Sequence, residues 1–220
     1  ETRAEAALAK NLFLLAVTIS DDVADEDGDA ALVADLVALL HGGTPRQAPT
    51  ANHRATLDHV AELLAEAHAL CSAGPSHATI APFLDFDLRQ VWNNFSHAVL
   101  VNATPAATNL QESLTYGGHN MMMLVFADID LCFSPAVDPS ELGRMREAFL
   151  HAQVIARVGN WVTTWRREIP KGDYTSGMFA GLMGENPASV ARWLADPAAA
   201  TQAIESSGME GSLLEQWSTH

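Results

Sequence analysis

Three oxygen-bearing side chains recur at every fourth position near residue 160: Asn160, Thr164 and Glu168. On a helix of 3.6 residues per turn they form one short row. Amide, hydroxyl and carboxylate oxygens in such a row can hold a hard divalent cation such as Mg²⁺. Arg157 and Arg167 lie beside the row, and positive charge next to a metal suits a polyphosphate ligand. The same residue types also meet this spacing by chance, so the row needs a second segment to support it.

An acidic segment far upstream supplies that support. Six acids occupy nine positions without a basic residue: Asp21, Asp22, Asp25, Glu26, Asp27 and Asp29. They follow an apolar stretch, residues 11–19, that predicts a buried helix. Like charges one helical turn apart each cost about 0.2–0.5 kcal/mol, so acids placed there indicate a cation site. A solvated acidic loop is the alternative, whereas an EF-hand is excluded because Gly28 as its sixth position would put Val23 first.

The two segments together resemble the motifs of class I terpene synthases. The family's aspartate-rich DDxxD motif is matched by Asp21, Asp22 and Asp25, and its (N/D)xxx(S/T)xxxE motif by the Asn160 row. The separation of the two motifs is also similar to that of the family. Arg157, Arg167 and the pair Gly172-Asp173 match further family features, and the flanking Trp161 and Trp165 look most like bacterial diterpene cyclases of the ent-kaurene or terpentetriene synthase kind.

The resemblance implies an all-α helical bundle around a central apolar cavity. It implies Mg²⁺-dependent ionisation and cyclisation of geranylgeranyl or a bicyclic copalyl-type diphosphate to a cyclic terpene, with release of diphosphate. The expected ligands of about three Mg²⁺ ions are Asp21, Asp22, Asp25, Asn160, Thr164 and Glu168. Arg157 and Arg167 are expected to bind the diphosphate and promote its departure. Expected contacts with the rest of the substrate are Phe83, Trp92, Gly118 and Asn120.

Phe83 and Trp92 belong to an aromatic set on one predicted helix, and aromatic faces stabilise a cation by about 0.5–2 kcal/mol each. Ordinary core packing is the alternative for this set. Gly118 and Asn120 lie where Gly117-Gly118 should break an apolar helix, since each such glycine costs about 1 kcal/mol against Ala. The break either exposes backbone groups to a ligand or only allows close helix packing.

The chain departs from the family pattern in three places. The position of the family's diphosphate-sensing arginine holds Leu114, and no arginine lies between Arg89 and Arg144. The family's C-terminal Arg-Tyr pair is missing, and only 20 residues precede Asp21. We therefore expect residues 1–220 to form a single terpene-synthase α domain that lacks N-terminal helices and the C-terminal end.

Three alternatives stay open at this point. A sesquiterpene cyclase acting on farnesyl diphosphate would use the same residues. A chain-elongating prenyltransferase would need a second aspartate-rich motif, which the Asn160 row is not. A non-catalytic helical scaffold would bind neither Mg²⁺ nor pyrophosphate.

Composition restricts the partners. Of 220 residues, 48% are hydrophobic and 18% charged, which predicts a globular protein with one sizeable core. The net charge of −15 argues against nucleic acid as a partner. Two widely spaced cysteines, Cys71 and Cys132, fit a reducing cytoplasm, and no apolar run predicts membrane insertion. A homodimer is compatible with these features.

Apolar periodicity and Gly or Pro breaks predict an all-α chain without strands. The expected helices span residues 1–25, 30–40, 56–71, 80–101, 110–132 with the break at Gly117-Gly118, and 140–168, followed by a short helix from Asn186.

Overall fold

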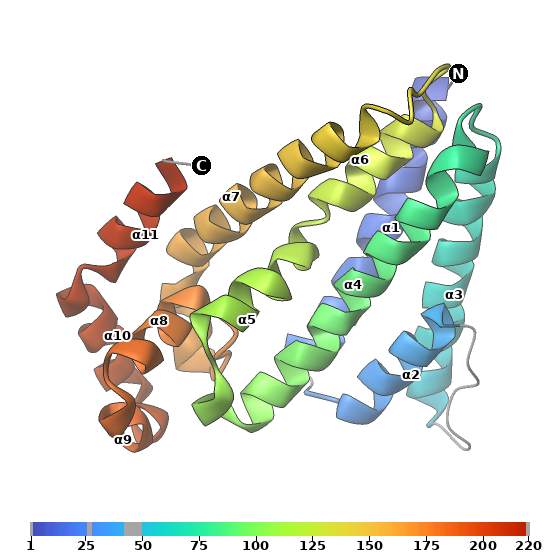
Figure 1. Ribbon diagram of the computed structural model, residues 1–220. Coiled ribbons are helices and arrows are strands. Elements are labelled where there is room, and N and C mark those ends of the chain that lie inside the picture. The colour runs from blue at the N-terminus through green and yellow to red at the C-terminus, as the bar shows by residue number, and fades with distance from the viewer. Residues whose placement is uncertain (1, 26–27, 42–49, 219–220) are drawn as a thin grey trace.

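A computed structural model describes residues 2–25, 28–41 and 50–218, and all regular structure in these ranges is helical. The predicted all-α class is therefore confirmed. Figure 1 shows long helices lying side by side, with short C-terminal helices gathered around one end of α7. None of the helices in these ranges is long and apolar enough to cross a lipid bilayer.

The first half of the chain forms four α-helices, which are α1 (Thr2–Asp25), α2 (Ala30–Leu40), α3 (Ala51–Ser72) and α4 (His77–Ala103). Helix α3 begins five residues before the predicted start. The reason is local, because the Thr50 hydroxyl accepts a hydrogen bond of 3.2 Å from the amide of His53 and caps the helix. The Thr50 cap therefore starts the helix at Ala51, ahead of its first buried apolar residue, Leu57.

The predicted helix over 110–132 is broken as expected. It is divided into α5 (Leu110–Thr115), the 3-10 turn η2 (Gly117–Met121) and α6 (Met123–Cys132), after the short turn η1 (Pro105–Ala107). Met122 joins η2 to α6 in the left-handed region, at φ 56°. A non-glycine residue is uncommon there, so the break is a specific feature of the chain.

Helix α7 (Leu142–Glu168) is followed by a compact C-terminal layer. This layer consists of η3 (Ile169–Lys171), α8 (Gly177–Glu185), η4 (Pro187–Ser189), α9 (Val190–Ala195), α10 (Pro197–Ser207) and α11 (Met209–Ser218). A short helical segment follows Asn186 as predicted, in η4 and α9, whereas α8, α10 and α11 were not predicted. The Ser176 and Asp196 side chains cap α8 and α10, and the helices bury apolar faces against α7.

Two apolar cores hold these helices together. The larger joins α1, α2, α3, α4 and α6, and contains the fully buried Phe13, Trp92 and Phe95. The smaller joins α7 to the C-terminal layer through Trp161 and Trp165, both of which are 0% exposed. Helices α1 and α7 run in the same direction (Figure 1), so their C-terminal ends lie at the same end of the bundle.

The contact between α7 and α8 gives a first testable prediction. A Cβ on Gly177, the first residue of α8, would lie 2.3 Å from two ring carbons of the fully buried Trp161. We expect Gly177→Ala to lower the free energy of unfolding by about 1–3 kcal/mol, because a tightly packed core does not accept an added methyl group. Chemical denaturation measures this change.

Gly159→Ala in the middle of α7 is the matched control. Nothing lies within 4 Å of a Cβ built there, so the same substitution should stabilise the protein by up to about 1 kcal/mol through helix propensity. Equal effects at Gly177 and Gly159 would contradict the close approach of α8 to Trp161.

Candidate functional site

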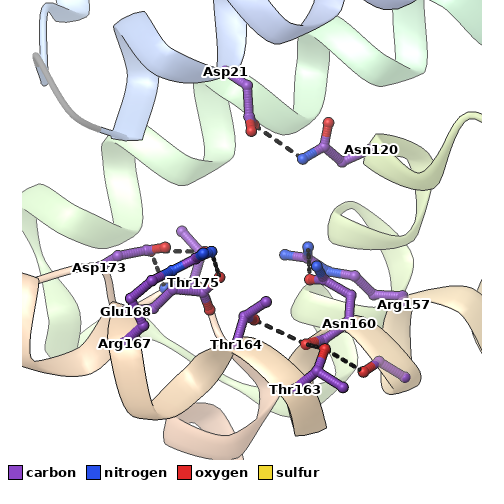
Figure 2. A network of polar contacts seen from close by, with 11 residues as sticks. Asp21, Asn120, Arg157, Asn160, Thr163, Thr164, Arg167, Glu168, Asp173 and Thr175 are labelled. Atoms are coloured by element: carbon purple, nitrogen blue, oxygen red, sulfur yellow. Dashed lines mark hydrogen bonds and ion pairs between the residues drawn. The ribbon is translucent and has the colours of Figure 1, made fainter.

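An acidic pocket lies at the shared end of α1 and α7. Its volume is about 570 Å³, and every side chain in its lining is charged: Asp21, Asp22, Asp25, Arg167, Glu168, Lys171 and Asp173. Figure 2 shows Asp21 on one side of the opening and Glu168 on the other. The structure thus brings three of the six acids of the upstream segment, Asp21, Asp22 and Asp25, to the last residue of the Asn160 row. Glu26 and Asp27, also part of the acidic run, lie outside the described residues.

Asp21 and Asp25 lie one turn apart at the end of α1 and are partly buried. Burial raises the pKa of Asp21, although a 2.9 Å hydrogen bond from the Asn120 amide group opposes the rise. Burial also raises the pKa of Asp25 to about 8, and the charges of Asp173 and Asp21 act in the same direction. Within the described residues, Asp25 Oδ1 is buried and has no hydrogen-bond partner. A bound cation would favour the ionised form of carboxylates gathered in this way.

Asp173 is a fifth carboxylate of the pocket, which the sequence reading noted only as part of a Gly-Asp pair. Gly172 adopts φ 86° after α7 and turns the chain back. Asp173 Oδ1 then accepts hydrogen bonds from the Thr175 amide (3.0 Å) and hydroxyl (2.8 Å), which fix the carboxylate. Burial raises the pKa of Glu168, and the charge of Asp173 adds to the rise. Lys171, also missed as a site residue, lies in the same lining.

Arg157 is a buried cation next to this pocket. It is only 7% exposed, and its Nη1 donates a 3.1 Å hydrogen bond to Asn160 Oδ1. Its Nε has no hydrogen-bond partner among the described residues. Gly117 packs against the guanidinium, since a Cβ there would lie 3.2 Å from Nε. Burial lowers the pKa of Arg157, whereas nearby carboxylates, Asp173 first, oppose the fall.

The Asn160 row is only partly directed at the pocket. Glu168 lines it, but Asn160 and Thr164 do not. The Asn160 side-chain oxygen is engaged by Arg157, and the Thr164 hydroxyl donates to the Asn160 backbone oxygen at 2.8 Å. These two side chains use local partners on α7, as short polar side chains often do in helices, and Figure 2 shows both beside Arg157 and Glu168.

The other expected substrate contacts are distributed differently. Arg167 lies at the rim, with a side chain 70% exposed and Nη2 3.8 Å from Glu168 Oε1. Trp92 is fully buried and packs edge-on against Phe95 in the larger core. The guanidinium of Arg146 lies over the ring of Phe83, with Arg146 Cζ 4.9 Å from the centroid of that ring. Neither aromatic side chain lines the acidic pocket, because both face the core side of α4.

The turn that contains Gly117 and Gly118 packs against α7 and carries Asn120, which reaches the pocket. Gly118 is buried and lies beside Gln153 of α7. The Gln153 amide group contacts His119 Nδ1 at 3.3 Å, and its oxygen accepts from the Leu124 amide at 3.4 Å. Gln153 therefore caps α6 from a neighbouring helix, since α6 has no capping side chain of its own. This arrangement holds Asn120 where it reaches Asp21.

A second polar cluster, which sequence reading missed, lies in the larger core. Arg146 of α7 bridges Asp87 of α4 (2.8 Å) and Asp128 of α6 (3.3 Å), and both carboxylates are almost wholly buried. Each of them is the one acid among the buried residues of its helix. An acid at such a position is the signal that would have revealed the cluster.

This cluster predicts how stability depends on pH. Burial raises the pKa of Asp128 to about 8, Asp87 adds to the rise through a hydrogen bond and its charge, and Arg146 opposes it. The carboxyl group of an exposed Asp has a pKa of about 3.8, so between about pH 4 and 8 the folded protein holds a proton that the unfolded chain releases. The free energy of unfolding should therefore fall as pH rises, by up to about 1.4 kcal/mol per pH unit for one proton.

Asp128→Asn should remove this component of the slope. Denaturant unfolding of the variant and the wild type at several pH values measures the difference. Asp130→Asn, on the exposed side of the same helix, should keep the wild-type slope. An unchanged slope in Asp128→Asn would show that Asp128 is ionised throughout.

The donor set of the acidic pocket fits Mg²⁺. Carboxylate oxygens are the ligands that Mg²⁺ prefers, and the orphaned Asp25 oxygen is available for coordination. Across the described residues, no three His, Cys, Asp or Glu side chains are already arranged to hold one ion. Mg²⁺ commonly keeps several waters and is held by one or two carboxylates together with substrate phosphates. The pocket therefore suits ions shared between protein and a bridging anion.

No protein-family model, curated protein or solved structure matches this chain.

Proposed function

We propose that this chain is a class I terpene synthase, which ionises and cyclises an isoprenoid diphosphate with Mg²⁺. The observation that carries the proposal is the meeting of the two motif ends in one charged pocket. Asp21, Asp22 and Asp25 arrive from α1, and Glu168 and Arg167 from the end of α7. The resemblance to the terpene synthase motifs and the all-helical fold support the same conclusion.

The chain's own residues would act on the diphosphate end of the substrate. The carboxylates of Asp21, Asp25 and Glu168 would hold Mg²⁺, and Asp173 would add negative charge beside them. Bound Mg²⁺ supplies a Lewis acid that neutralises the leaving diphosphate. Arg167 and Lys171 at the pocket would donate hydrogen bonds to phosphate oxygens. Arg157, buried behind the pocket, would add positive charge that stabilises the leaving diphosphate.

The reaction then follows from the substrate's chemistry. The bond between the allylic carbon and the diphosphate oxygen breaks, and its electron pair leaves on the diphosphate. The resulting carbocation forms a ring by attack of an internal double bond. Loss of a proton gives a cyclic alkene, for which geranylgeranyl and copalyl-type diphosphates are the proposed precursors.

Diphosphate release tests the proposal. Geranylgeranyl, copalyl-type and farnesyl diphosphates are each incubated with the full chain, with and without Mg²⁺, and the products are separated by gas chromatography. We expect Mg²⁺-dependent release with a cyclic hydrocarbon or alcohol as product. A longer prenyl diphosphate formed with isopentenyl diphosphate would identify an elongating enzyme. Calorimetry that detects no binding of Mg²⁺ with pyrophosphate would identify a scaffold.

A further inference from the structure

One neutral side chain next to the acidic pocket joins its two walls. Asp21 belongs to the wall at the end of α1, and Glu168 to the wall at the end of α7. Asn120, in the turn η2 between α5 and α6, donates a hydrogen bond of 2.9 Å from its side-chain nitrogen to Asp21 Oδ1. Figure 2 shows the two side chains facing each other. Asn120 is not part of the pocket lining, so its contact with the site is made through Asp21.

The turn that carries Asn120 is held against α7. The Gln153 amide group contacts His119 Nδ1 at 3.3 Å, and the Arg157 guanidinium packs against Gly117, where a Cβ would lie 3.2 Å from Nε. Both side chains from α7 are buried, at 3% and 7% exposure, and buried polar groups fixed in this way rarely change position. The position of Asn120 is therefore set by α7, whereas the carboxylate that it contacts belongs to α1.

The hydrogen bond from Asn120 restricts the Asp21 carboxylate. An aspartate side chain turns about two bonds, so fixing one oxygen largely sets the direction of the other. The bond occupies Oδ1 and leaves Oδ2 for a cation. Because the amide donor is neutral, it orients the carboxylate without cancelling its charge. Hydrogen-bond partners of metal ligands act in this way, and losing one commonly lowers metal affinity by about 10- to 100-fold.

From these contacts we propose that Asn120 is a positioning residue of the cation site. It ties Asp21 of α1 to a turn fixed on α7, so that the carboxylates of the two walls are already in place when Mg²⁺ binds between them. The inference rests on the proposed function for the presence of Mg²⁺ at the pocket. It gives Asn120 a role through Asp21, in place of the direct substrate contact expected from the sequence.

Calorimetry on the full chain tests this role without a turnover. Pyrophosphate is titrated into the protein at a fixed excess of Mg²⁺, and again without Mg²⁺. We expect saturable binding to the wild type that requires Mg²⁺. Asn120→Ala should weaken this binding by about tenfold or more, because the Asp21 carboxylate is no longer oriented.

A double variant shows whether Asn120 acts through Asp21. Asp21→Ala alone should weaken the Mg²⁺-dependent binding. Adding Asn120→Ala to it should weaken the binding by no more than about a further twofold, because the group that Asn120 orients is already gone. Losses that multiply in the double variant would show that Asn120 contacts the metal or the anion itself, and would overturn the positioning role.

Asn109→Ala is the control for a structural asparagine. The Asn109 side chain caps α5 by accepting a 2.9 Å hydrogen bond from the Glu112 amide, and it does not line the acidic pocket. This variant should unfold at a lower urea concentration but bind pyrophosphate with Mg²⁺ as the wild type does. Equal losses of binding in Asn109→Ala and Asn120→Ala would show a general effect of destabilisation and contradict the inference.

The outcomes separate this inference from the proposed reaction. Wild-type affinity in Asn120→Ala would overturn the positioning role, and the reaction would stand on its own test. Binding that depends on Asn120, without release of diphosphate from any isoprenoid, would support the positioning role and overturn the reaction. If pyrophosphate with Mg²⁺ did not bind to the wild type, both would fail.

Discussion

Replacement of Glu168 by Gln is expected to lower the Mg²⁺-dependent rate of diphosphate release by about 10³-fold. Glutamine keeps the shape of the side chain but removes the negative charge that α7 contributes to the pocket. A metal at the leaving group stabilises the transition state by several kcal/mol, and a loss of about 4 kcal/mol corresponds to that factor. Release of inorganic diphosphate at several Mg²⁺ concentrations measures the effect.

The stability of Glu168→Gln shows whether such a loss is chemical. Burial and the neighbouring carboxylate raise the pKa of Glu168, so the neutral variant should unfold no more easily than the wild type at neutral pH. Glu62→Gln, the same change on the exposed face of α3, should keep full activity. A rate within about twofold of the wild type in Glu168→Gln would remove this residue from the metal site.

Arg146→Met should have the largest effect on stability, a loss of about 3–5 kcal/mol in the free energy of unfolding. The Asp87 and Asp128 side chains are 2% and 3% exposed, and Arg146 forms an ion pair with each of them. Without it, the two acidic side chains lie buried near each other with no positive charge beside them. Urea denaturation of the variant measures the loss.

Two further variants show whether the loss comes from the unpaired acids. Arg144→Met, whose side chain is 82% exposed and pairs with Glu141, should change stability by less than about 1 kcal/mol. Adding Asp87→Asn and Asp128→Asn to Arg146→Met should restore part of the loss, because neutral amides cost less to bury. If Arg146→Met were as stable as the wild type, the cluster would contribute specificity of packing rather than stability.

The helices of the first 168 residues were predictable because each carries its own start and stop signals. Gly117-Gly118 marked the break, and Pro170 with Gly172 marked the end of α7. The C-terminal layer was not predictable in the same way. Helix α8 is rich in glycine, and it forms because its apolar residues pack on Trp161 and Trp165. Tertiary packing outweighed weak local propensity there.

The site shows a similar division. Motif spacing identified acids from α1 and α7 that share a pocket, because spacing encodes which face of a helix a residue occupies. It did not reveal that the Asn160 side-chain oxygen accepts a hydrogen bond from Arg157 and does not line the pocket. That outcome depends on side-chain conformation, which motif spacing does not encode. Asp87, Asp128 and Arg146 come from three different helices. Their spacing in the sequence therefore forms no recognisable motif.

The parallel course of α1 and α7 has a consequence for the order in which ligands arrive. Each helix carries about half a negative elementary charge at its C-terminal end, and both ends lie at the acidic pocket. Their fields add to those of the carboxylates and attract divalent cations from solution before any organic ligand approaches. A free polyphosphate anion is repelled by the same field, whereas its magnesium complex is not. Binding should therefore begin with the cation.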